Sequence, residues 1–185
     1  MLKSHGFKRS KADHTLFTHR TSRGIVVVLI YVDDIIISGD DKDGIQNTKA
    51  FLHSTFAIKD LGELKYFLGI EIYRSSEGLF LSQRKYALDL LSETGKLGVK
   101  PAPTPLEEGY QAKRKGEHKQ NQDKDAPLDP LHAPYEDVTR YRCLVGKLIY
   151  LTITRHDLCY AVNEVSQFMK AATKYHWSMV ERILS

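Results

Sequence analysis

The strongest hydrophobic pattern in the chain is a run of branched apolar residues over 25–38, which two adjacent aspartates, Asp33 and Asp34, interrupt. β-Branched residues at this density, bounded by glycines at both ends, are typical of buried strands. Because the aspartates fall between the two halves of the run, the pattern predicts a β-hairpin with both carboxylates at its tip.

The acidic pair has two readings. Two adjacent carboxylates repel each other, so one is pushed toward its neutral form unless a cation holds both ionised. A hard divalent metal would do that. The alternative is an ordinary hairpin tip whose acids point into water, although tight turns favour Asn-Gly or Asp-Gly and this tip offers no glycine. The residues alone leave both readings open, and we favour the metal.

A helical pattern follows the hairpin over residues 44–56. We expect Asp40 or Asp41 to cap its first turn, because a carboxylate there accepts hydrogen bonds from free backbone N–H groups. The apolar residues fall on one stripe, which predicts a helix lying on a sheet. This stripe consists of Ile45, Leu52 and Phe56.

Upstream of the hairpin, the pattern predicts a loop that leads into a short strand over 16–19, with nothing before it to pair. A basic cluster precedes that strand at Lys8, Arg9 and Lys11. A solvated turn explains such a cluster, and contact with phosphate is the sharper alternative.

A second strand-like region begins at residue 64. Apolar and polar residues alternate over 64–74, which predicts one strand, with Gly69 marking a bulge or a close approach by another backbone. Residues 79–82 return as the partner strand of a second hairpin. Ser82 is then expected to cap a helix over 83–94.

The composition changes over residues 100–136, which hold all six prolines and a polar, charged centre. This composition predicts a flexible linker. A basic triplet at 113–115 fits a localisation signal or a nucleic-acid patch, but the acidic residues around it favour a solvated tether.

Helical spacing returns in the last fifty residues. Three segments are expected, with Asp157 capping the second and the third beginning near Lys174. The predicted fold class is α+β, an antiparallel sheet with packed helices followed by a helical segment. Its predicted divisions are a domain over 1–99, the linker over 100–136 and the helical segment over 137–185.

The composition restricts the function only weakly. The net charge of +4 permits a polyanionic partner without requiring one. Two cysteines are too few for a disulfide framework, and neither a signal peptide nor a membrane-spanning run is present in the sequence. We therefore expect an intracellular protein, cytoplasmic or nuclear, with no membrane partner.

Four blocks in order make the chain resemble the reverse transcriptase of copia-type LTR retrotransposons, part of a Pol polyprotein. The first block is Tyr-Val-Asp-Asp within the apolar hairpin. The others are the Lys-Asp-Leu-Gly-Glu-Leu-Lys-Tyr-Phe-Leu-Gly-Ile stretch, Leu-Ser-Gln-Arg-Lys-Tyr, and Leu-Val-Gly-Lys-Leu-Ile-Tyr-Leu. They span residues 31–34, 59–70, 81–86 and 144–151.

This resemblance implies a right-hand polymerase fold, with a partial palm followed by a thumb-like or connection-like helical segment. It implies that Asp33 and Asp34 are catalytic aspartates that bind Mg²⁺ or Mn²⁺, Asp33 being the better placed. Other site residues follow by the same resemblance. Those near the primer end and nucleotide are Tyr31 and Val32, the primer-grip-like residues are Phe67, Leu68, Gly69 and Ile70, and candidate phosphate contacts are Gln83, Arg84 and Lys85.

The resemblance also implies which partners the family has and which parts of its active site this chain lacks. The family reaction is template-directed DNA synthesis on an RNA or DNA template-primer with dNTPs. The family has a further aspartate on an earlier palm strand, after the fingers, and this chain begins after both and stops before RNase H. We therefore expect the fragment to be inactive without the rest of the polyprotein. The alternatives are a non-catalytic remnant that binds nucleic acid or a partner chain, and a product with no selected role.

Overall fold

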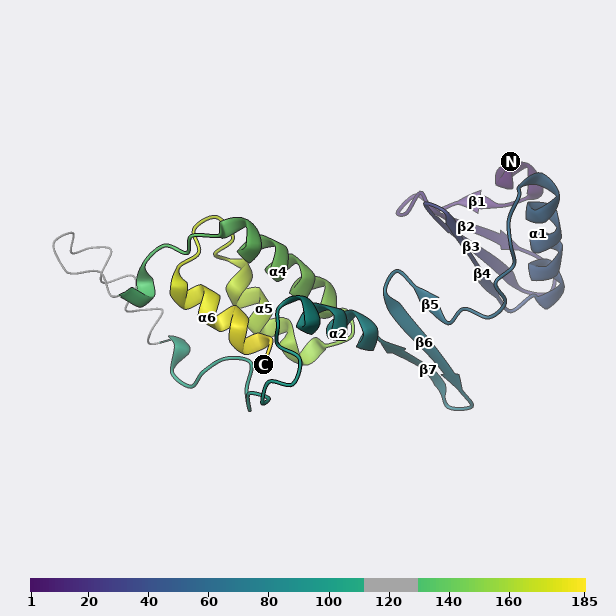
Figure 1. Ribbon diagram of the computed structural model, residues 1–185. Coiled ribbons are helices and arrows are strands. Elements are labelled where there is room, and N and C mark those ends of the chain that lie inside the picture. Colours follow the sequence, from purple (N-terminus) through teal and green to yellow (C-terminus); the bar gives the residue numbers. More distant parts are fainter. Residues whose placement is uncertain (112–129) are drawn as a thin grey trace. The chain divides into compact units, whose positions relative to one another are not determined.

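The computed structural model describes residues 1–111 and 130–185 (Figure 1). The chain divides into two compact units, Met1–Leu64 and Lys65–Ser185. The predicted division at residues 99 and 136 rests on composition and stays a prediction. The centre of the predicted linker and the basic triplet at 113–115 lie outside the described residues.

The first unit is built on a four-stranded antiparallel sheet in the order β1-β2-β3-β4. The predicted apolar hairpin is confirmed as two paired strands of this sheet. The expectation that the preceding strand has no upstream partner is wrong, because Lys8 and Arg9 pair with Thr18 and Phe17. The strands are β1 (Lys8–Arg9), β2 (Leu16–Arg20), β3 (Ile25–Tyr31) and β4 (Asp34–Gly39).

One helix, α1 (Lys42–Thr55), packs against β3 and β4 of this sheet (Figure 1). Asp41 is its N-cap and accepts a hydrogen bond from the Gly44 amide at 2.9 Å, which confirms the expected capping. Leu52 is fully buried, whereas Phe56, expected on the buried stripe, is exposed beyond the last turn. A short 3-10 helix, η1 (Leu2–His5), adds Leu2 to the same core.

The second unit begins with a three-stranded antiparallel sheet, β5 (Tyr66–Phe67), β6 (Ile70–Ser75) and β7 (Gly78–Ser82). The single strand predicted over 64–74 is therefore wrong. Leu68 and Gly69, with φ of 49° and 83°, form a two-residue turn between β5 and β6. Such turns need positive φ at their centre, so Gly69 marks a turn and not a bulge.

Helices make up the rest of the second unit. They are α2 (Arg84–Glu93), α4 (Val138–Leu151), α5 (Cys159–Ser166) and α6 (Lys174–Ile183), with the 3-10 helices η2 (Pro130–His132) and η3 (His156–Leu158). The predicted helical periodicity of the C-terminal region is confirmed. The residue before α2 is Gln83, but the Ser82 hydroxyl accepts a hydrogen bond from the Arg84 amide at 3.2 Å, so Ser82 caps the first turn as expected. The predicted cap at Asp157 is wrong, because this carboxylate instead accepts two hydrogen bonds from the Arg155 guanidinium.

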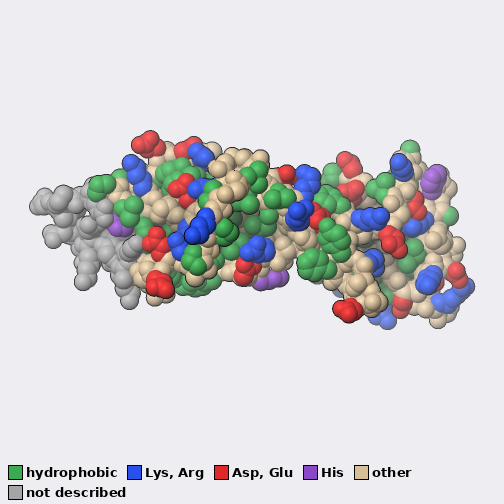
Figure 2. Space-filling model, turned by 60° about the horizontal axis from the view of Figure 1, so that its bottom comes forward, with side chains coloured by type: hydrophobic (Ala, Val, Ile, Leu, Met, Phe, Trp, Pro, Cys, Tyr) green, Lys and Arg blue, Asp and Glu red, His purple; other side chains and the backbone are tan. Residues whose placement is uncertain are grey.

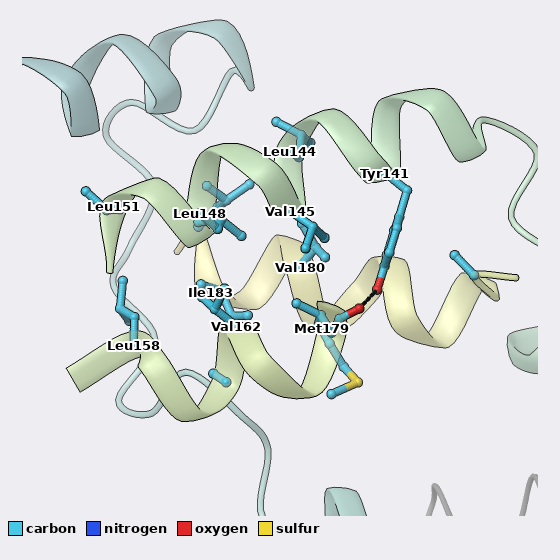
Figure 3. Packing of buried hydrophobic residues seen from close by; sticks show 14 of the residues in the cluster. Tyr141, Leu144, Val145, Leu148, Leu151, Leu158, Val162, Met179, Val180 and Ile183 are labelled. Atoms are coloured by element: carbon cyan, nitrogen blue, oxygen red, sulfur yellow. Dashed lines mark hydrogen bonds between the residues drawn. The ribbon is translucent and has the colours of Figure 1, made fainter. Parts of the chain in front are cut away.

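The core of the second unit lies between α4, α5 and α6, whose apolar side chains face one another (Figure 3). Tyr141 is fully buried within it, and its hydroxyl donates to the Val165 carbonyl at 2.7 Å. Burial raises the pKa of Tyr141 far above its usual range, so the hydroxyl stays a donor. Thr173 and His176 form a capping box that begins α6.

On the face shown in Figure 2, basic and acidic side chains are interspersed. A surface of this kind fits the small net charge and has no broad single-sign field. Within the two described stretches, no helix has the length and apolar character needed to cross a bilayer.

Candidate active site

The candidate site is the tip of the β3–β4 hairpin. Tyr31 pairs with Asp34, so the loop consists of Val32 and Asp33 alone. Val32 has a φ of 50° and is 82% exposed. A β-branched residue in this left-handed region is an outlier that costs about 1–3 kcal/mol. Such strain, with no burial to compensate it, is typical of functional sites.

The two carboxylates are placed differently on this tip. Asp33 is the second residue of the turn, and Asp34 is the first residue of β4. Ile35 and Ile37 pack into the core beneath α1, so Asp34 lies on the opposite face of the sheet. Both aspartates are exposed. In the described part of the chain, neither carboxylate takes part in a hydrogen bond or an ion pair.

These carboxylates are ligands of the type that a divalent metal prefers, but two of them are too few to complete a metal site. Carboxylate oxygens are the ligands that Mg²⁺ and Mn²⁺ prefer. Among the described residues, however, no group of three or more His, Cys, Asp or Glu side chains is close enough to hold an ion. The hairpin therefore supplies part of a metal site, and the described residues supply no further ligand.

A pocket of about 670 Å³ lies beside the hairpin tip. Asp33 and Val32 line it together with buried or half-buried apolar side chains from the sheet and from α1. Lys3 and Arg9 line the same pocket, so Arg9 of the predicted basic cluster lies on β1 at this pocket rather than in a solvated turn. The remaining lining residues are Met1, Leu2, Phe17, Ile30, Ile35, Leu52, Phe56, Ala57 and Ile58.

The predicted primer-grip-like residues occupy the β5–β6 hairpin of the second unit. Phe67 and Ile70 are paired and flank the turn at Leu68 and Gly69. The Tyr150 hydroxyl of α4 donates to the Leu68 carbonyl, and this bond holds the turn against the helix. A Cβ added at Gly69 would lie 3.5 Å from the Tyr150 ring, an ordinary contact, so the positive φ is what favours glycine.

The three candidate phosphate contacts are not equivalent. Gln83 is only 3% exposed, and its amide donates to the Tyr150 carbonyl at 3.3 Å and accepts from the Thr154 hydroxyl at 2.8 Å. Arg84 and Lys85 are exposed. Only these two therefore present side chains to solvent, and Gln83 instead ties the start of α2 to α4.

Tyr150 contacts the Leu68–Gly69 turn, and no local pattern in the sequence predicts this contact. It anchors the Leu68–Gly69 turn through its hydroxyl, and its ring packs edge-on against Tyr86 with centroids 5.1 Å apart. The only signal in the sequence is its position in the last of the four resembling blocks. Its partner lies 82 residues away, a separation that local patterns do not report.

The chain was compared with known proteins. Residues 1–108 match the protein family described as reverse transcriptase (RNA-dependent DNA polymerase). Two Arabidopsis thaliana proteins, the retrovirus-related Pol polyproteins from transposons RE2 and RE1, are 41% and 42% identical over 97% of the chain. The corresponding polyprotein from transposon TNT 1-94 of Nicotiana tabacum is 33% identical over 99%.

The chain covers 11% of the length of the two Arabidopsis polyproteins and 13% of the tobacco one. No solved structure matches it. The family match covers more than half of the chain and includes the candidate hairpin and the β5–β7 sheet. The copia-type resemblance is confirmed, and the chain belongs to the reverse transcriptase (RNA-dependent DNA polymerase) family.

Proposed function

We propose that this chain contributes the metal-binding hairpin of a reverse transcriptase palm, followed by a thumb-like or connection-like helical unit. The observation that carries the proposal is the tip of the β3–β4 hairpin, where strained backbone at Val32 presents two exposed carboxylates without partners among the described residues. In a chain of this family, such a tip is suited to phosphoryl transfer, because that chemistry needs hard oxygen ligands.

In this proposal Asp33 and Asp34 hold Mg²⁺ or Mn²⁺. A divalent cation held there would supply the charge that activates a primer 3′-hydroxyl and stabilises a leaving group. Tyr31 and Val32 lie beside the primer end and the incoming nucleotide. The Leu68–Gly69 turn, held by Tyr150, positions the primer, and Arg84 and Lys85 meet phosphate.

The proposed reaction is template-directed DNA synthesis from a primer 3′ end, in the cytoplasm or nucleus. Its partners are an RNA or DNA template-primer, dNTPs and the rest of a Pol polyprotein. The described residues include only two of the ligands that a two-metal centre requires. We therefore propose that the chain does not catalyse this reaction by itself.

A primer-extension assay with the purified chain tests this proposal. With Mg²⁺ or Mn²⁺, an annealed template-primer and all four dNTPs, we expect no incorporation above background. Incorporation that disappears in the Asp33→Asn variant would show a complete active site within the chain and would overturn the proposed inactivity. Incorporation that persists in Asp33→Asn would point to a contaminating polymerase.

A second candidate function is non-catalytic association with nucleic acid or a partner chain. The observation that favours it is the position of β4 at the edge of the first sheet, because an unpaired strand edge is a template for pairing. Analytical ultracentrifugation over a range of protein concentrations tests this alternative. A chain that stays monomeric and does not bind DNA would argue against it and would leave a product with no selected role.

A further inference from the structure

One face of the β5–β7 sheet carries three exposed aromatic side chains, Tyr66, Tyr73 and Phe80, called here the aromatic face. They are 54%, 53% and 66% exposed. Tyr73 and Phe80 are directly opposed across β6 and β7, with ring centroids 6.2 Å apart and planes at 42°. Because Tyr66 pairs with Glu71, two residues before Tyr73, it lies on the same face.

The opposite face of the same sheet is mainly aliphatic and carries one ring, Phe67, which pairs with Ile70. The paired residues Ile72 and Leu81 lie there, and Leu79 pairs with Arg74 on that side. Three of the four aromatic residues of the sheet thus lie on one face. A stacking surface requires planar rings, and the aromatic face supplies three exposed ones.

The start of α2 adjoins the aromatic face through Glu71. The Glu71 carboxylate accepts from the Tyr73 hydroxyl at 2.7 Å and from the Lys85 backbone amide at 3.1 Å. Lys85 forms an exposed pair with Asp89 at 2.7 Å. Arg84 is exposed and has no ion pair within the described residues. The positive charge of Arg84 lies close enough to Glu71 to contribute to the lowered pKa of that carboxyl, and Glu71 already accepts hydrogen bonds from two donors.

We propose that the aromatic face and Arg84 form a contact surface for a single nucleic-acid strand, with the rings stacking on bases and Arg84 meeting phosphate. Exposed aromatic residues beside cations are the usual means by which proteins hold single strands without reading their sequence. This inference rests on the proposed function, since it extends the strand contact beyond the Leu68–Gly69 turn.

Fluorescence anisotropy with a labelled oligodeoxythymidylate, in EDTA and without dNTPs, tests the proposal. We expect the full chain to bind, and Tyr73→Leu/Phe80→Leu to weaken binding by about tenfold or more, because each stacked base contributes about 1–3 kcal/mol. Leucine keeps the apolar area and removes the rings. The matched control, Leu79→Ala on the opposite face, should bind as the native chain does. Circular dichroism checks that all variants are folded.

Salt dependence tests the role of Arg84. The Arg84→Ala variant should lower the slope of log K against log salt by about 0.7, the value for one released counterion on a single strand. Unchanged binding in the double leucine variant would overturn the proposal. Failure of the native chain to bind would also overturn the proposal. The same holds if the chain self-associates and this association is lost in Tyr73→Ala/Phe80→Ala but retained in Tyr73→Leu/Phe80→Leu. Because no metal is present, these outcomes are independent of Asp33 and Asp34.

Discussion

Val32 is the residue at which the hairpin tip departs from ordinary turn chemistry. Its left-handed backbone is disfavoured for a β-branched side chain. Because the side chain is exposed, burial does not offset this conformational strain. Sequence reasoning predicted the hairpin correctly, but of the two aspartates only Asp33 lies in its loop, because Asp34 is the first residue of β4. That reasoning could not identify the strained turn, because no pattern of residue types predicts valine at positive φ.

Relieving this strain should stabilise the first unit. We expect Val32→Asn to raise the free energy of unfolding by about 1 kcal/mol, because asparagine tolerates the left-handed region. Amide hydrogen exchange of β3 and β4 measures the change. Val99→Asn, at an exposed position without positive φ, is the matched control and should have little effect. A Val32→Asn variant that is no more stable than the native chain would contradict the strain.

Asp41 makes the stability of the first unit depend on pH. The Thr21 hydroxyl, at 2.6 Å, and the Gly44 amide donate to its carboxylate and lower the pKa of Asp41 below its usual value. A carboxylate with a lowered folded-state pKa stabilises the fold above its unfolded pKa of about 3.9 and loses that contribution as pH falls through the folded-state pKa.

We therefore expect the stability of the native chain to fall more steeply below about pH 4 than that of Asp41→Asn, which has no charge to lose. Urea denaturation followed by circular dichroism at several acidic pH values measures both. Parallel pH profiles for the two proteins would show that Asp41 is not linked to folding.

At the scale of elements, the apolar hairpin, α1, α2 and the three C-terminal helices were predictable because each follows a clear period. The hairpin between β5 and β6 was not. In one continuous strand, Tyr66 and Ile70 would lie on the same face of the sheet. Because the chain turns at Leu68 and Gly69, Tyr66 pairs with Glu71 and lies on the face opposite to that of Ile70. Leu-Gly is also a weaker turn signal than Asn-Gly.

The burial of Gln83 illustrates the same limit. It depends on hydrogen bonds to residues 67 and 71 positions away in the sequence. A polar residue beside two cations looks like a surface residue until those partners are known. Only the tertiary structure therefore shows that Gln83 is buried while Arg84 and Lys85 are exposed.

Two glycines of the second unit should respond oppositely to alanine. Gly69 has a positive φ, so Gly69→Ala should destabilise the β5–β6 hairpin by about 1 kcal/mol. Gly146 lies within α4, and an added Cβ there would meet no described atom within 4 Å apart from its chain neighbours and the nearby backbone of its own helix. Gly146→Ala should stabilise the helical core by about 0.5–1 kcal/mol.

Amide exchange of β6 measures the first change, and fluorescence of Trp177, the single tryptophan of the chain, follows the second during urea denaturation. Shifts of the same sign for both substitutions would contradict the turn assigned to Leu68 and Gly69.

At the scale of the whole molecule, the chain belongs to the reverse transcriptase (RNA-dependent DNA polymerase) family. The matched region includes both candidate contact sites, yet the chain covers only about a tenth of the Pol polyproteins to which it is similar. The mixed sheet-and-helix fold class was predicted from periodicity. The palm and thumb assignment came from resemblance, and it makes one direct claim, that Asp33 and Asp34 bind a divalent metal.

Paramagnetic line broadening by Mn²⁺ tests that claim most directly. As Mn²⁺ is titrated into the isotope-labelled chain, the amide signals of residues 31–35 should broaden first. This selectivity should disappear in Asp33→Asn/Asp34→Asn and persist in Glu107→Gln/Glu108→Gln, which neutralises another adjacent, exposed acidic pair. Broadening that begins elsewhere, or that is unchanged when both aspartates are replaced, would contradict the assignment of the hairpin as the metal-binding element.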